Sequence, residues 1–175
     1  MKKLILVIAL LMCSQLAMAF SYTLEISADE LQSKVSAMMP MEKKKSFITV
    51  ILSHPEIDLT VGNNKIGVSS QIAIVALGGI SGSGKVKITG LLSYDSEKSA
   101  FFFKNPEVVS LESEDVPPLL LPKVKALTQL AVSQFLSKKP IYKLKDDNVK
   151  QKLTKAVLQS IQVENNQLLA ELSLF

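Results

Sequence analysis

The sequence is poor in the side chains that most enzymes use for chemistry. Its 175 residues contain no arginine, no tryptophan, one histidine (His54) and one cysteine (Cys13). Cys13 lies in an N-terminal segment that we expect to be removed, which excludes disulfides, thiol catalysis and cysteine metal sites in the processed chain. A catalytic triad would have to be assembled around His54, which we interpret as a surface residue instead. We therefore predict a protein that is not an enzyme and uses no cofactor or metal.

The N-terminal residues have the pattern of a signal peptide. Two lysines precede the apolar run Leu4–Met12, and a small-residue Ala-Met-Ala cleavage site ends at Ala19. The run is too short to span a bilayer, which takes about 20 apolar residues. We predict that residues 1–19 are cleaved off before Phe20, and that residues 20–175 form one soluble periplasmic domain with no transmembrane span.

Cys13 leaves a second interpretation of this segment open. Acylation of a cysteine after the apolar run would anchor the protein to the outer membrane. The residue before such a cysteine is normally small, whereas here it is Met12. We therefore favour cleavage after Ala19 and keep lipidation of Cys13 as the alternative.

Charge does not indicate a nucleic-acid partner. The formal net charge is +4, and loss of Lys2 and Lys3 lowers it to 4 − 2 = +2. The densest basic cluster, Lys43-Lys44-Lys45, has no aromatic residue between its lysines, so we interpret it as a solvated loop.

The segment Gly79–Val86 resembles a phosphate-binding loop but lacks two of its features. That motif needs Ser or Thr after its lysine, and here Val86 follows Lys85. It also needs a helix next, whereas residues 85–89 alternate apolar and polar as a strand does. We interpret the segment as a glycine-rich hairpin.

Residues 47–111 have the period-two alternation of β-strands. Short turns divide this region into four strands, which should pair antiparallel as a meander. In the last strand, Phe101 and Phe103 should face the core. Phe102 should point the opposite way, where it either is covered by a helix or lines a cavity. Alternation returns around Asn165-Asn166 and predicts a C-terminal hairpin.

Three segments have the period of amphipathic helices. Ser27 and Glu30 form a capping box before the first one. The second, at Pro117–Ser137, is long, and Pro122 either kinks it or marks its start. Asp146 or Asp147 would cap the third, with Val149, Leu153, Ala156 and Val157 facing inward. These segments predict a single α+β domain in which helices cover a face of an antiparallel sheet.

Three stretches of the chain together resemble a known family. Tyr22-Thr23-Leu24 leads into the first helix, Tyr94–Lys104 contains the triple phenylalanine, and Lys139–Leu144 follows the long helix. Their order and spacing are similar to those of the YceB-like bacterial envelope lipoproteins, a family of unknown function (DUF1439), over nearly all of residues 20–174.

The resemblance implies a fold related to tubular lipid-binding proteins. A curved antiparallel sheet, here a four-strand meander plus the C-terminal hairpin, would wrap the long helix, with two shorter helices beside it. The implied function is non-enzymatic binding of a lipid or other apolar ligand between sheet and helix. The alternative is a periplasmic interaction or assembly factor with a closed core. We expect the groove to be lined by Phe101, Phe103, Leu120, Val124, Leu127, Ala131 and Phe135.

Overall fold

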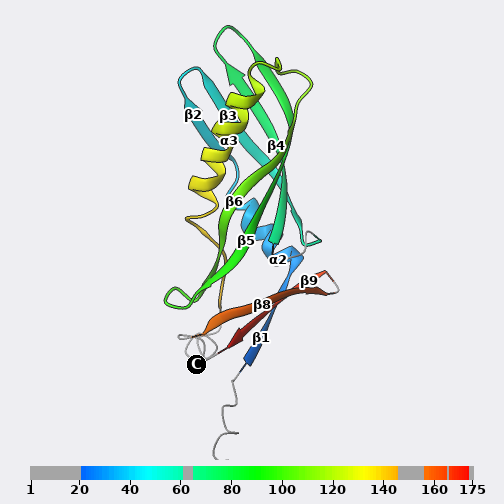
Figure 1. Ribbon diagram of the computed structural model, residues 1–175, viewed down its shortest axis with the longest axis vertical. Coiled ribbons are helices and arrows are strands. Elements are labelled where there is room, and N and C mark those ends of the chain that lie inside the picture. The colour runs from blue at the N-terminus through cyan, green and yellow to red at the C-terminus, as the bar shows by residue number, and fades with distance from the viewer. Residues whose placement is uncertain (1–20, 61–64, 146–155, 165, 174–175) are drawn as a thin grey trace, which may run out of the picture.

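A computed structural model describes residues 21–60, 65–145, 156–164 and 166–173 (Figure 1). These residues form nine strands, in two antiparallel sheets, and two helices. The elements are arranged along one long axis, with the larger sheet towards one end and the smaller sheet at the other (Figure 1).

Six strands form the larger sheet, and their spatial order is also their order in the chain. Side chains of alternate residues face the core, as Val86 and Ile88 do in the central part of the sheet. Gly78 and Gly79 make one of its turns with φ values of 88° and 79°, a conformation that glycine adopts without steric cost. The strands are β2 (Met41–Lys45), β3 (Ile48–Asp58), β4 (Lys65–Ala76), β5 (Ser81–Asp95), β6 (Ala100–Glu112) and β7 (Pro140–Lys143).

Three strands form the smaller sheet, in the order β1 (Ser21–Ser27), β9 (Gln167–Ser173) and β8 (Val157–Glu164). The hairpin of β8 and β9 is the one expected at the C-terminus, and β1 pairs with β9 along its whole length. The two sheets contact each other through β5 and β8.

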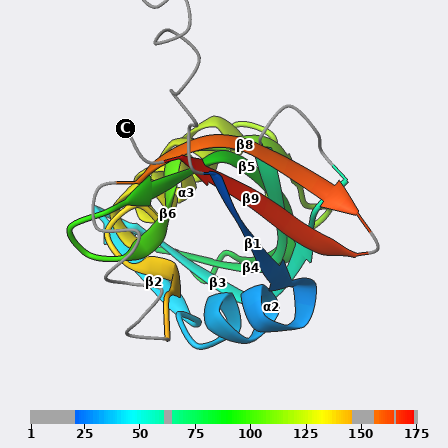
Figure 2. The same ribbon diagram turned by 90° about the horizontal axis from the view of Figure 1, so that it is seen from below.

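The two helices lie across the open side of the curled larger sheet (Figure 2). The helix α2 (Ala28–Ser36) contacts β3 and β7, and α3 (Leu121–Phe135) contacts β2, β3 and β6. Because β2 and β7 are the two edges of the sheet, helices that contact both sides hold the curl together. Side chains from both helices and from the strands fill one continuous core.

Both helix starts follow from the local sequence. Ser27 Oγ accepts a hydrogen bond from Glu30 N at 3.2 Å, which confirms Ser27 as the N-cap of α2. Pro122 occupies the first turn of α3, where its missing N–H costs no hydrogen bond, so this proline marks the start of the helix rather than a kink.

Each helix is also attached to the sheet by a glutamine side chain. In α3, Gln129 Oε1 accepts a hydrogen bond from Val108 N at 2.8 Å, and its Nε2 donates to Pro106 O at 2.7 Å. In α2, Gln32 makes the equivalent two bonds with the N–H of Ile57 and the carbonyl of Pro55.

The two glutamine sites have the same local sequence in the strand. A residue with positive φ, His54 at 48° or Asn105 at 50°, is followed by Pro-Glu and a β-branched residue. The strand register shifts at both places. A bulge of this kind takes backbone groups out of the ladder, and a glutamine amide supplies both the donor and the acceptor that they need.

The predicted α+β class is wrong, because the structure is mostly β. The expected four strands are extended by β2 and β7 at the edges, and β1 joins the C-terminal hairpin in a separate sheet. The expected long helix is shorter, covering residues 121–135 rather than 117–137. The described residues hold two helices instead of three. The strand β2 was missed because its five residues include three lysines, which indicated a loop.

The third expected helix is not found among the described residues. Its capping residues Asp146 and Asp147, with Val149 and Leu153, lie outside the described residues. Val157, which we placed on its inward face, is instead the first residue of β8.

Candidate ligand-binding grooves

The residues predicted to line a groove come together around α3 and β6, but most of them are packed inside the core. Five are at most 4% exposed, namely Phe101, Phe103, Val124, Leu127 and Ala131. Leu120 and Phe135 are partly buried against the same core. These side chains therefore fill space between sheet and helix.

The aromatic part of this core is closely packed. The Phe101 ring lies 5.0 Å from the Tyr94 ring and 6.2 Å from the Tyr142 ring, centroid to centroid. Burial raises the pKa of both tyrosine hydroxyls. Phe103 occupies the space above Gly90, where an added Cβ would stand 2.9 Å from two of its ring atoms. Phe101 and Phe103 thus serve the packing of β5 against β6 and β7.

An open hollow does lie between α3 and the turn that joins β2 to β3. We call it the α3 groove, and its volume is about 300 Å³. Leu127 is the one predicted lining residue that borders it. The groove is lined by Lys45, Ser46, Phe47, Ile48, Lys123, Ala126, Leu127 and Leu130.

The α3 groove combines an apolar wall with a basic rim. Phe47 is 40% exposed and Leu130 is 41% exposed, and both line the same hollow, so their exposed surfaces form one apolar wall. Lys123 Nζ lies 5.4 Å from the centroid of the Phe47 ring, and Lys45 borders the same hollow. None of the eight lining residues is acidic. The groove can therefore hold an apolar chain whose polar end is neutral or negative.

Sequence reasoning missed most residues of the α3 groove. Phe47 was interpreted as the start of a strand, whereas it lies in the turn before β3. Ala126 and Leu130 are spaced four residues apart on α3, outside the stripe that we assigned to the core. That spacing was a usable signal, since two apolar residues one turn apart on the polar side of a helix form an apolar surface of their own.

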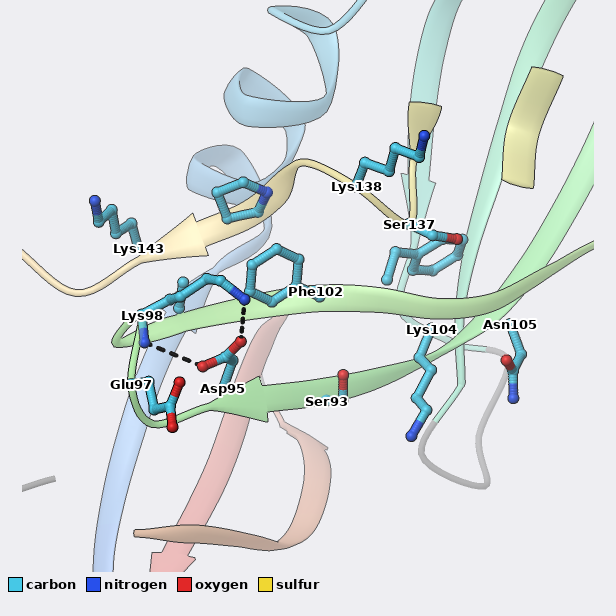
Figure 3. A pocket seen from close by; sticks show the side chains of 13 residues that line it. Ser93, Asp95, Glu97, Lys98, Phe102, Lys104, Asn105, Ser137, Lys138 and Lys143 are labelled. Carbon is cyan, nitrogen blue, oxygen red and sulfur yellow. Dashed lines mark hydrogen bonds and ion pairs between the residues drawn. The ribbon is translucent and has the colours of Figure 1, made fainter. Parts of the chain in front are cut away.

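A second hollow, which we call the hairpin groove, lies on the outer side of β6 (Figure 3). Its volume is about 780 Å³. Residues from the end of the β5–β6 hairpin form one side, and residues 137–143 form the other. Phe102 is half-buried between the buried Phe101 and Phe103, as its predicted opposite orientation requires, and it lines this groove. Phe103, one of the predicted lining residues, also borders the hairpin groove, although its side chain is buried.

Nine of the thirteen residues that line the hairpin groove are polar or charged. Lys98 Nζ lies 2.6 Å from Asp95 Oδ2 and 5.3 Å from the centroid of the Phe102 ring. Hydrogen bonds from the Lys98 side chain and backbone lower the pKa of the Asp95 carboxyl, and Asp95 raises the pKa of Lys98. Lys104, Lys138 and Glu97 also border the groove. An acyl chain would gain little here, because charged groups would lose water to make room for it.

The other motifs singled out in the sequence are surface features. His54 is exposed, with Ser53 Oγ 3.1 Å from its Nδ1. Lys85 is exposed in the strand β5, so the glycine-rich segment before it is part of a hairpin, as predicted. Lys43-Lys44-Lys45 lies in β2 and not in a loop, and Lys43 Nζ donates to Gln134 Oε1 at 2.6 Å.

The described residues can be assessed for a metal site and for a membrane-spanning helix. Within that part of the chain, no three His, Cys, Asp or Glu side chains are grouped closely enough to hold a metal ion. None of the described helices has both the length and the apolar character needed to cross a bilayer.

The family is decided by a comparison with family models. The model described as "Protein of unknown function (DUF1439)" matches residues 26–167, from the end of β1 to the first residue of β9, which is well over half of the chain. The chain belongs to the DUF1439 family. A search of curated proteins found no match.

Proposed function

We propose that this DUF1439 protein is an exported, non-enzymatic protein that binds an apolar or amphipathic lipid chain between α3 and the larger sheet. The observation that carries the proposal is the α3 groove, in which Phe47 and Leu130 leave large apolar surfaces open beside Leu127. The proposed site lies between α3 and the β2 edge of the sheet, whereas the sequence predicted a groove around Phe101 and Phe103.

The affinity that such a groove supports can be bounded. Each methylene group that leaves water contributes about 0.8 kcal/mol. A chain that buries about ten of them gains about 8 kcal/mol, against an association cost of about 4 kcal/mol or more. The expected affinity is therefore weak to moderate, in the range of a protein that takes up and releases its ligand.

The proposal is tested by filling the groove from α3. Ala126 lines the groove and is exposed, so Ala126→Trp should occupy the ligand's place without disturbing the core. Ser133→Trp is the matched control, because Ser133 is exposed on the same helix but does not line the groove. Ala126→Trp should lower the binding of a fluorescent fatty acid at least about tenfold, and Ser133→Trp should leave it unchanged. A wild type that binds no such probe would refute the proposal.

A second candidate function is supported by the packing of the core. Phe101, Val124 and Ala131 have no exposed surface, as expected for an interaction or assembly factor with a closed core. This candidate would stand if the wild type bound no apolar probe and another envelope protein were recovered with it.

Export and the wider family relation belong to the same proposal. We propose cleavage between Ala19 and Phe20, with lipidation at Cys13 as the alternative. Intact-mass measurement of protein purified from the envelope separates the two, because a chain that begins at Cys13 would carry acyl groups. The relation to YceB-like lipoproteins and tubular lipid-binding proteins supports a lipid ligand in the same way, as an expectation from resemblance.

A further inference from the structure

Large apolar side chains are exposed at one end of the molecule, on three separate segments. Leu119 is 87% exposed, Leu77 is 76% exposed, Val75 is 50% exposed and Phe47 is 40% exposed. Leu119 and Leu77 are the two most exposed large apolar side chains among the described residues. Surface leucines exposed to this degree are ordinary one at a time, but a group of them marks an interaction site.

The three segments lie at the same end of the long axis. They are the β2–β3 turn, the end of β4 with the β4–β5 turn, and residues 113–120 between β6 and α3, and all three lie at the upper end in Figure 1. Leu77 N donates a hydrogen bond to Phe47 O at 3.0 Å, which joins the first two turns directly. We call these three segments the tip. The three-stranded sheet, with β8, lies at the opposite end (Figure 1).

The elements that run up to the tip on one side are basic. Together, β2 and α3 carry five lysines and a single acidic residue, Glu42, although Lys43 bonds to Gln134 near the end of α3 that is farther from the tip. Lys45 and Lys123 border the α3 groove beside Phe47. The tip segment 113–120 itself contains Glu114 and Asp115, and a hydrogen bond of 3.4 Å from Ser83 Oγ to Asp115 Oδ2 places that carboxylate beside β5. The positive charge near the tip therefore lies on the side of β2 and α3, at Lys45 and Lys123.

We propose that the tip docks on the surface of a bilayer that contains anionic lipids. Leucines on separate turns can enter the boundary between head groups and acyl chains without a matching pocket, which a protein partner would have to supply. Lysines at that depth extend their charged ends to the anionic head groups. The charge of β2 and α3 therefore complements the bilayer while the leucines insert. This docking does not require a ligand in the α3 groove.

The test uses sedimentation of the full processed protein with vesicles. Vesicles of phosphatidylglycerol mixed with phosphatidylcholine should bind the wild type, and phosphatidylcholine alone should bind it far less. The double variant Leu77→Ser/Leu119→Ser should lower the partition coefficient at least about tenfold, since two leucines no longer leave water. Higher salt should also weaken binding, because it screens the lysines.

Val157→Ser/Val163→Ser is the matched control. These valines are 43% and 41% exposed on β8, at the end away from the tip, and their replacement should leave vesicle binding unchanged. A wild type that does not sediment with anionic vesicles overturns the proposal. So does an equal loss in both double variants.

Two further measurements distinguish vesicle docking by the tip from a folding defect and from ligand binding in the α3 groove. A solvent-sensitive dye on Leu119→Cys should report an apolar environment with anionic vesicles, whereas the same dye on Val163→Cys should not. Ala126→Trp should still bind vesicles, even though it is expected to lose the fatty-acid probe. If Ala126→Trp lost vesicle binding while the leucine variant kept it, the groove and not the tip would hold the membrane.

Discussion

The packing of Phe103 over Gly90 gives a prediction in which two opposing effects can be weighed. Gly90 does not have a left-handed φ, so alanine can adopt its backbone conformation. By restricting the unfolded chain, Gly90→Ala would by itself stabilise the protein by about 0.4–1 kcal/mol. However, the new Cβ would stand 2.9 Å from Cε1 and Cζ of Phe103 and 3.2 Å from Lys104 O.

The cost of overpacking should exceed the gain from restricting the unfolded chain. Forcing a methyl group into a filled core costs about 1–3 kcal/mol, so Gly90→Ala should lower the free energy of unfolding by up to about 2.6 kcal/mol overall. In a Phe103→Leu background the two ring atoms are gone, and Gly90→Ala should then be neutral or slightly stabilising. Urea unfolding of the four variants of this cycle measures the coupling between the two sites.

Two results would contradict the reasoning. If Gly90→Ala stabilised the wild type, the space above Gly90 would be open and the Phe103 ring would not fill it. If Gly90→Ala cost the same with phenylalanine or leucine at position 103, its cost would come from the backbone of Lys104 and not from the ring.

Three further predictions test the core, the helix attachment and the hairpin charge pair. Ala131→Trp should destabilise the protein by about 1–3 kcal/mol or more in thermal or urea unfolding, because Ala131 has no exposed surface, and unchanged stability would reveal room for a ligand there. Gln129→Met should cost about 1–3 kcal/mol, since it leaves the buried N–H of Val108 unpaired, and a cost near zero would mean that water replaces the glutamine. Lys98→Ala should raise the pKa of the Asp95 carboxyl in an NMR titration, because Lys98 holds that pKa below its ordinary value of 3.8. In the wild type, the stability that the pair contributes is fully present above pH 3.8 and is lost as the pH falls through the lowered pKa of Asp95.

The parts of the fold that follow a simple period could be predicted from the sequence. Alternation located the strands from β3 to β6, and the Ser27 cap located α2. The fold class could not be predicted, because two short edge strands carry weak signals. The strand β2 is rich in lysine, and β7 has only four residues that begin with proline. Their place is set by pairing with strands already present and not by their own propensity.

The candidate site, like the fold, could be predicted from the sequence only in part. The apolar stripe of α3 correctly indicated which side chains face the sheet, but a stripe cannot tell a packed core from an open groove. That difference depends on what stands opposite each residue, as Gly90 stands opposite Phe103 and the exposed Phe47 stands beside Leu127. The glutamine sites had a sequence signal that we did not use, since His54-Pro55-Glu56-Ile57 and Asn105-Pro106-Glu107-Val108 share one pattern.

The way α3 is held has a consequence for the dynamics of the protein. Among the described residues, its hydrogen bonds to the sheet run through the side chains of Gln129 and Gln134, Lys123 lies over the Phe47 ring, and its buried side chains pack into the apolar core. The helix can therefore detach while every ladder between the strands stays intact. In a hydrogen-exchange experiment its amides should form a unit of their own, opening at a lower free energy than those of β4 and β5, which pair with strands on both sides. The strands of the larger sheet should then stay paired while α3 opens.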